Sequence, residues 1–173
     1  MTDGSDRPDA DATVDSDRSP ADIVDDIDRP VLLFDGVCNL CNSTIRAIVR
    51  LDDEGEILFA PLQSDVAAEL LDRAGMDADY FDSVVLVERS GHLDSGDADD
   101  WDVSTKSTAV LEVCRKLDGP APLLYPLVNL PERLRNGVYD FVAEHRYRVF
   151  GRKDECPIPP ERLRQRFLER SLA

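Results

Sequence analysis

The stretch Pro30–Asp52, PVLLFDGVCNLCNSTIRAIVRLD, decides the fold that the sequence predicts. It opens with an apolar run, Val31–Phe34, which predicts a short strand, and continues with Asp35-Gly36, which predicts a tight turn. Apolar residues in its last third recur at helical spacing and predict an amphipathic helix. Two cysteines, Cys38 and Cys41, therefore lie where a strand gives way to the start of a helix.

A C-x-x-C pair at the start of a helix is a setting in which a thiol becomes reactive. Unpaired backbone N–H groups and the positive end of the helix dipole stabilise a thiolate there. The pKa of a cysteine can then fall from about 8.5 to roughly 3.5–7.5. The spacing places Cys38 at the exposed end of the first turn and Cys41 one turn further in. We therefore predict Cys38 as the attacking thiolate and Cys41 as the thiol that resolves a mixed disulfide.

The residue that ends the predicted strand, Asp35, should lie close to both sulfurs. Its carboxylate could accept a proton from Cys41, or it could only form the turn together with Gly36. The alternative for the cysteine pair is half of a structural zinc site, which needs four ligands. The other candidate ligands are scattered singly along the chain: Cys114, Cys156, His92 and His145. Since they lack the spacing of a zinc site, no metal or other cofactor is predicted.

The motif DGVCNLCN after an apolar strand resembles the signature of the DCC-type (DCC1-like) thiol-disulfide oxidoreductases, which are named for an Asp, a Cys and a Cys. These correspond here to Asp35, Cys38 and Cys41. The resemblance continues through DSVVLVE (82–88), STKSTAVLEVCRKL (104–117) and VYDFVAEHRYRVFGRKDEC (138–156). It covers about residues 30–170 and implies a thioredoxin-like fold. It also implies disulfide exchange at Cys38 and Cys41 with a protein or low-molecular-weight disulfide or thiol as substrate.

The rest of the chain is consistent with an α/β, thioredoxin-like three-layer sandwich that has a central mixed sheet and extra C-terminal helices. Further strands are expected at 56–60, 83–88 and 101–103, and helices at 64–75, from 105 or 107 through Cys114, at 131–150 and at 160–172. The first two strands should be parallel, because a helix connects them. Thioredoxins place a cis-proline before the central antiparallel strand. The matching residues 80–83 contain no proline, so Ser83 should supply the backbone near Cys38.

Four other features leave alternatives open. Cys156 lies in a loop where the family also has a cysteine, so it could be an accessory redox thiol or could pack beneath the last helix. Cys114 lies among apolar residues and is expected to be a small buried side chain. The apolar segment 119–131 could line a groove beside the cysteines or only bridge two helices. Residues 146–148, Arg-Tyr-Arg, should form ion pairs, although they could instead orient an anionic substrate.

The length of 173 residues suits one domain, predicted at 29–173, behind an acidic tail at 1–28. The tail carries ten Asp against two Arg, half of the formal net charge of −16. It has few apolar residues, no periodicity and no features of a signal peptide, so it is predicted to be disordered. Only Ile23, Val24 and Ile27 near its end suggest a turn that could dock on the domain.

The charge pattern bounds the function. Aspartate is abundant while lysine occurs at three positions only, which predicts an acidic surface adapted to a high-salt cytoplasm. Nucleic acid is not an expected partner because no basic patch is dense enough, and no apolar run approaches the ~20 residues that span a bilayer. The sequence thus favours a cytoplasmic thiol-disulfide oxidoreductase. The alternatives are a non-catalytic zinc-binding domain or a protein-interaction domain that uses the same cysteines structurally.

Overall fold

The computed structural model describes residues 18–77, 83–90, 101–152 and 166–168. Within these ranges four strands form one sheet in the order β2-β1-β3-β4. The strands are β1 (Val31–Phe34), β2 (Leu58–Pro61), β3 (Val85–Arg89) and β4 (Trp101–Thr105). β1 and β2 are parallel, whereas β3 runs antiparallel to β1, and β4 antiparallel to β3. The sheet is therefore mixed, as the sequence predicted.

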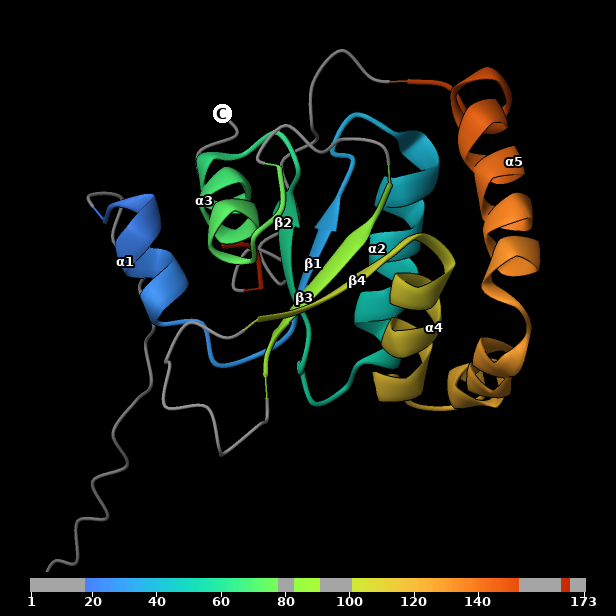
Figure 1. The fold of residues 1–173 in the computed structure, drawn as a ribbon, viewed down its shortest axis with the longest axis horizontal. Coiled ribbons are helices and arrows are strands. Elements are labelled where there is room, and N and C mark those ends of the chain that lie inside the picture. Colours follow the sequence, from blue (N-terminus) through green and yellow to red (C-terminus); the bar gives the residue numbers. More distant parts are fainter. Residues whose placement is uncertain (1–17, 78–82, 91–100, 153–165, 169–173) are drawn as a thin grey trace, which may run out of the picture.

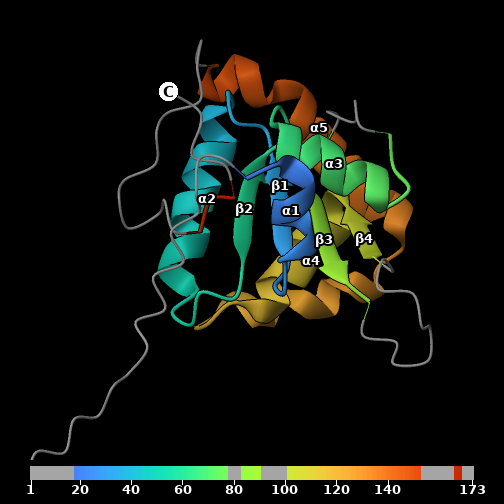
Figure 2. The same ribbon diagram turned by 90° about the vertical axis from the view of Figure 1, so that its left-hand side faces the viewer.

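Helices cover both faces of this sheet (Figures 1 and 2). They are α1 (Pro20–Asp25), α2 (Asn39–Leu51), α3 (Asp65–Arg73), α4 (Lys106–Lys116), the 3-10 helix η1 (Ala121–Asn129) and α5 (Glu132–Phe150). Figure 1 shows α1 and α3 on one face, α2 and α4 on the other, and α5 outside α2 and α4. The α/β architecture is consistent with the predicted thioredoxin-like fold.

The first strand lies at the centre of the core. Its side chains alternate between the two faces of the sheet, so that Val31 and Leu33 pack toward α1 and α3 while Leu32 and Phe34 pack toward α2 and α4. All four residues are at most 3% exposed. A strand covered by helices on both faces needs an uninterrupted apolar sequence, which is why this run was easy to recognise.

Most predicted elements are confirmed, with shifted ends. The second strand begins at Leu58 rather than at residue 56, because the buried Asp52 carboxylate accepts the backbone N–H groups of Glu56 and Ile57 at 3.0 and 3.1 Å. Ser64 caps α3 as predicted, and its hydroxyl accepts the Ala67 N–H at 3.1 Å. The third and fourth strands run to residues 89 and 105.

A helix was predicted at 160–172, of which the structure describes three residues, 166–168. At these three residues the prediction is wrong. Arg166–Leu168 pair instead with the outer edge of β2, where the Phe59 N–H donates to the Arg166 carbonyl at 2.8 Å and the Leu168 N–H donates to the Phe59 carbonyl at 3.1 Å. The edge of a sheet offers unpaired backbone groups to such a segment. The Phe167 ring also packs 5.9 Å from the Phe34 ring and 5.7 Å from the Phe59 ring, between centroids.

The Phe167 ring should contribute measurably to stability. Replacing Phe167 with leucine is expected to lower the free energy of unfolding by about 1–2 kcal/mol, because part of a buried ring is lost. Urea unfolding followed by circular dichroism measures the change. Phe141→Leu is the matched control, since Phe141 is 64% exposed on α5 and should change stability by less than about 0.5 kcal/mol. Equal losses in both variants would contradict the role given to Phe167.

The predicted tail boundary at residue 28 lies too far along the chain. Ser19 caps α1, and Val24 and Ile27 are buried against the domain, as their apolar character had suggested. The Arg89 guanidinium also donates to the Ile27 carbonyl at 2.7 Å and to the Asp25 carbonyl at 2.8 Å. Residues 1–17, which carry the remainder of the predicted tail, lie outside the described residues.

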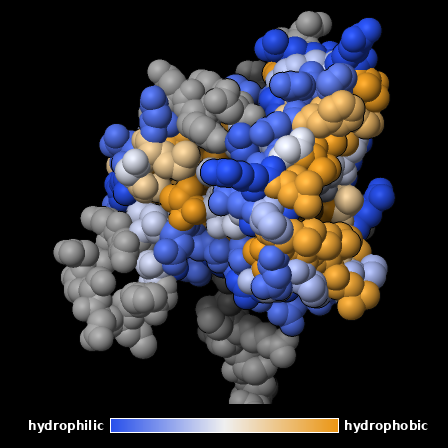
Figure 3. Space-filling model, turned by 45° about the vertical axis from the view of Figure 1, so that its right-hand side comes forward, coloured by the Kyte–Doolittle hydropathy of each residue, from blue (hydrophilic) through white to orange (hydrophobic). Residues whose placement is uncertain are grey.

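The outer side of η1 and α5 carries exposed apolar side chains (Figure 3). Leu123 is 79% exposed, and Leu134 and Phe141 are 60% and 64% exposed. η1 packs against α4 and leads into α5, so the segment 119–131 bridges two helices. In the ranges given above, every helix is too short or too polar to cross a membrane.

Candidate active site

Cys38 is the N-cap residue of α2, at the position that the sequence predicted. Its backbone is extended, with φ −81° and ψ 121°, and its Sγ accepts the Cys41 N–H at 3.4 Å. The turn before it is fixed by Asn42, whose side chain donates to the carbonyls of Gly36 and Cys38 at 2.8 and 3.0 Å. A backbone N–H directed at the sulfur stabilises negative charge on Cys38.

The expected exposure of the two cysteines is wrong, because Cys38 is fully buried while Cys41 is partly exposed. Residues at the end of α5 and just after it contact the cysteine turn. Arg152 forms an antiparallel bridge with Cys38, and the Asn39 side chain donates to the Phe150 carbonyl at 2.9 Å. The end of α5 is thus attached to the dipeptide that separates the cysteines.

The environment of Cys41 keeps it in the thiol form. Burial, followed by hydrogen bonding to Cys38 and the charge on Cys38, raises the pKa of Cys41 to about 12. The positive charge of Arg146 acts against this rise, and the negative charge of Asp35 adds to it. Cys41 is therefore protonated at neutral pH.

The carboxylate of Asp35 joins the cysteine turn to α5. One oxygen accepts the Val37 N–H at 3.1 Å and the Gln63 side-chain amide at 3.2 Å. The other accepts the Arg146 guanidinium at 3.2 Å and the Tyr147 hydroxyl. Asp35 is 6% exposed, so this is a buried ion pair. Its oxygens accept hydrogen bonds from the cysteine turn, from Gln63 and from α5. Among the described contacts no hydrogen bond joins them to Cys41.

The cluster around Asp35 confirms the expected ion pairing of residues 146–148 for Arg146, which pairs with Asp35. The Arg146 guanidinium also lies 4.9 Å from the centroid of the Tyr147 ring. Burial, and then the bond to Asp35, raises the pKa of Tyr147. No pattern in the sequence predicts that residues 146 and 147 contact Asp35, more than a hundred residues away, or that Gln63 does so as well. The charged character of residues 146–148 was the available signal.

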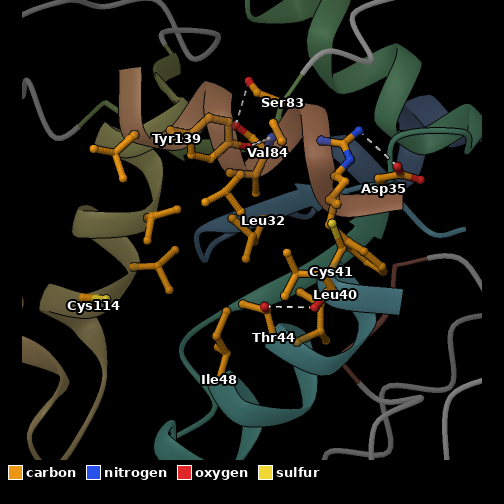
Figure 4. Close-up of a pocket in the computed structure, with 18 of the residues that line it drawn as sticks. Leu32, Asp35, Leu40, Cys41, Thr44, Ile48, Ser83, Val84, Cys114 and Tyr139 are labelled. Carbon is orange, nitrogen blue, oxygen red and sulfur yellow. Dashed lines mark hydrogen bonds and ion pairs between the residues drawn. The ribbon is translucent and has the colours of Figure 1, made fainter. Parts of the chain in front are cut away.

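A cavity of about 330 Å³ lies beside Cys41 (Figure 4). Its walls come from α2, α4 and α5, and its floor from β1 and the two residues before β3. Ser83 is one of these two residues, and its predicted position near Cys38 stays a prediction. Cys114 also lines the cavity and is only partly buried, which corrects its expected place inside the core. No described residue of segment 119–131 belongs to the lining.

Other candidates take no part in this site as far as the structure describes it. Cys156 and His92 lie outside the described residues. The Nδ1 atom of His145 lies 2.8 Å from the Phe141 carbonyl within α5. The described residues contain no group of three or more His, Cys, Asp or Glu that could hold a metal ion. The zinc alternative stays a prediction, because it required Cys156.

The sheet is thioredoxin-like, and the helix that follows its first strand has two free cysteines at its start. This arrangement is typical of proteins that use a pair of thiols. The chain belongs to the DCC1-like thiol-disulfide oxidoreductase family, whose model matches residues 32–152. The resemblance seen in the sequence is thereby confirmed.

Two relatives support the family assignment. The chain is 42% identical over 142 residues to the uncharacterized protein YuxK of Bacillus subtilis (strain 168), a match that covers 82% of this chain and 96% of that protein. It is 39% identical over 131 residues to a DCC family protein of Arabidopsis thaliana described as chloroplastic, covering 75% of this chain and 70% of that protein. No solved structure matches the chain.

Proposed function

We propose that the protein exchanges thiols and disulfides by cycling Cys38 and Cys41 between a dithiol and an intramolecular disulfide. The contact between the two cysteines carries this proposal. The Cys38 Sγ accepts the Cys41 N–H, and the Cys41 thiol is close enough to hydrogen bond with Cys38. Both are free thiols, and the family to which the chain belongs supports the same chemistry.

In the reducing direction, the Cys38 thiolate attacks one sulfur of a substrate disulfide. A mixed disulfide forms, and one substrate thiolate leaves. The Cys41 thiol then gives up its proton and attacks the Cys38 sulfur, which forms the intramolecular disulfide and expels the second substrate thiolate. The substrate gains two electrons and two protons, and the protein loses them. The oxidising direction consists of the same steps in reverse.

We assign the attack to Cys38 because the reaction needs a thiolate and Cys41 is held as a thiol. The burial of Cys38 adds a requirement to this assignment. The bridge between Cys38 and Arg152 must open before a substrate sulfur can reach Sγ in line. Attack by Cys41, which already faces the cavity, is the competing route, and variants of the two cysteines separate them.

The substrates that we propose are protein or low-molecular-weight disulfides and thiols. We place the reaction in a high-salt cytoplasm because the chain combines a formal charge of −16 with only three lysines. Such a surface stays hydrated where salt screens charge.

A redox titration tests the function directly. The protein is equilibrated in dithiothreitol buffers of graded potential, and its thiols are counted by mass after alkylation. We expect Cys38 and Cys41 to convert together as one two-electron couple, with a midpoint between about −270 and −120 mV. The Cys114→Ser variant is the control and should keep the same midpoint. Independent alkylation of all the thiols at every potential would refute the proposal.

A further inference from the structure

The exchange steps proposed above make no use of the cavity beside Cys41, although Cys41 lines it. Its volume of about 330 Å³ lies at the lower end of the range for small-molecule sites. Cys41 stands in its wall, and Asp35 and Arg146 line it as well. Figure 4 shows Cys41 and Asp35 on the same side of the cavity, with Cys114 across from them on α4.

The walls of the cavity are largely apolar. Side chains such as Ile48, Val113 and Val138 line it from α2, α4 and α5. Two of its polar residues already have partners, since the Thr44 hydroxyl donates to the Leu40 carbonyl at 3.0 Å and the Tyr139 hydroxyl accepts the Val84 N–H at 3.0 Å. A charged group placed among such walls would lose its hydration without gaining a partner. An uncharged apolar chain would gain from burial there.

On the polar side of the cavity the opposite charges are paired, but one hydrogen-bond donor has no acceptor among the described residues. The charges of Arg146 and Asp35 offset each other across 3.2 Å. The Nε–H of Arg146 is buried and has no hydrogen-bond partner among the described residues. An unpaired buried donor is unfavourable, so a ligand atom that accepts this hydrogen would be stabilised. A sulfur that becomes a thiolate next to Cys41 is such an acceptor.

We propose that this cavity binds the apolar chain of a small, uncharged disulfide or dithiol and presents its sulfur to the cysteine pair. The inference rests on the proposed function and names its substrate class. Cys41 lines the cavity and Cys38 does not, so the substrate sulfur reaches Cys38 only after the bridge between Cys38 and Arg152 opens. The substrate S–S bond breaks, the Cys38–Cys41 bond forms, and Arg146 Nε–H donates to the departing substrate sulfur. Charged disulfides of the same size are poor substrates because the apolar walls offer their charges no partner.

Three linear disulfides that differ only in their end groups test the substrate class: dipropyl disulfide, cystamine and 3,3′-dithiodipropionate. Pre-reduced protein is mixed with each, and oxidation of Cys38 and Cys41 is timed by alkylation and mass. Each rate is divided by the rate of the same disulfide with dithiothreitol, which removes differences in intrinsic reactivity. The buffer contains about 1 M potassium chloride, where the Debye length of about 3 Å suppresses steering by the net charge.

We expect the neutral disulfide to react at least about tenfold faster, after normalisation, than either charged one. Ala143 lines the cavity, so Ala143→Phe should fill it and reduce that preference at least about threefold. Val149→Phe is the matched control, because Val149 is 66% exposed on the same helix and lies outside the lining. Ala143→Leu, which adds less volume, should change the preference in the same direction if the phenylalanine variant does not fold.

The outcomes separate this inference from the function on which it rests. Equal normalised rates for the three disulfides, or a preference that Ala143→Phe and Ala143→Leu leave intact, would overturn the substrate class while the two-cysteine couple stands. Fastest reaction with a charged disulfide would overturn it as well. If Cys38 and Cys41 form no disulfide in the dithiothreitol titration, the proposed function itself is refuted.

Discussion

Cys38→Ser is expected to lower the rate of disulfide reduction by roughly three orders of magnitude or more, since a hydroxyl cannot replace the attacking thiolate. Cys41→Ser should behave differently. The Cys38 thiolate can still attack, but no neighbouring thiol releases the product, so a mixed disulfide with the substrate should accumulate. Mass spectrometry under non-reducing conditions measures that adduct on Cys38.

Cys114→Ser serves as the control for both variants, because Cys114 is the other free cysteine among the described residues and lines the far side of the cavity. It should form no lasting adduct. Accumulation of the adduct on Cys41 in the Cys38→Ser variant would show that the partly exposed cysteine attacks first. Full turnover by Cys38→Ser would exclude the two-cysteine mechanism.

Asp35→Asn is expected to destabilise the protein by about 3 kcal/mol, because the change leaves the charge of Arg146 buried and uncompensated. Asp140→Asn removes the partner of Lys106 from a more exposed ion pair, in which the Asp140 side chain is 47% exposed. Such a pair contributes about 0–1 kcal/mol, so this variant is the matched control. Urea unfolding of the reduced proteins measures both changes. Equal, small losses would show that the buried pair contributes no more than the exposed one.

The same substitution should also lower the pKa of Cys41. The charge of Asp35 helps to raise it, and Arg146 acts to lower it, so removing the carboxylate shifts the balance toward the thiolate. The pH profile of Cys41 alkylation should therefore move to lower pH in Asp35→Asn and stay in place in Asp140→Asn. An unchanged profile would mean that Asp35 acts on α5 alone and leaves the cysteine chemistry untouched.

Local sequence was sufficient for the central part of the fold. The run Val31–Phe34 is buried on both faces of the sheet, so its apolar character is continuous and unambiguous. The start of α2 was equally clear, because Cys38 occupies the N-cap. The end of α5 follows from Gly151, whose φ of +79° favours glycine. These features depend on residues adjacent in the chain.

The burial of Cys38 could not be predicted, because Arg152, which pairs with it, is more than a hundred residues away. The position of α5 over the cysteines was hidden for a related reason. Its apolar residues Leu134 and Phe141 are 60% and 64% exposed and lie outside the cavity lining, so its hydrophobic pattern does not mark the side that contacts the domain. Contacts made by Arg146 and Tyr147 through hydrogen bonds leave no periodic signal in the sequence.

The attachment of α5 to the cysteine turn has a thermodynamic consequence. Arg146 donates a hydrogen bond to Asp35, and the Phe150 carbonyl accepts one from Asn39. The helix is therefore attached at two residues that flank Cys38. If forming the disulfide weakens these attachments, linkage requires that releasing α5 favour the disulfide by the same free energy. Any molecule that draws α5 away would then shift the midpoint potential without touching a sulfur. Amide hydrogen exchange along α5, compared between the reduced and oxidised protein, would report the size of that coupling.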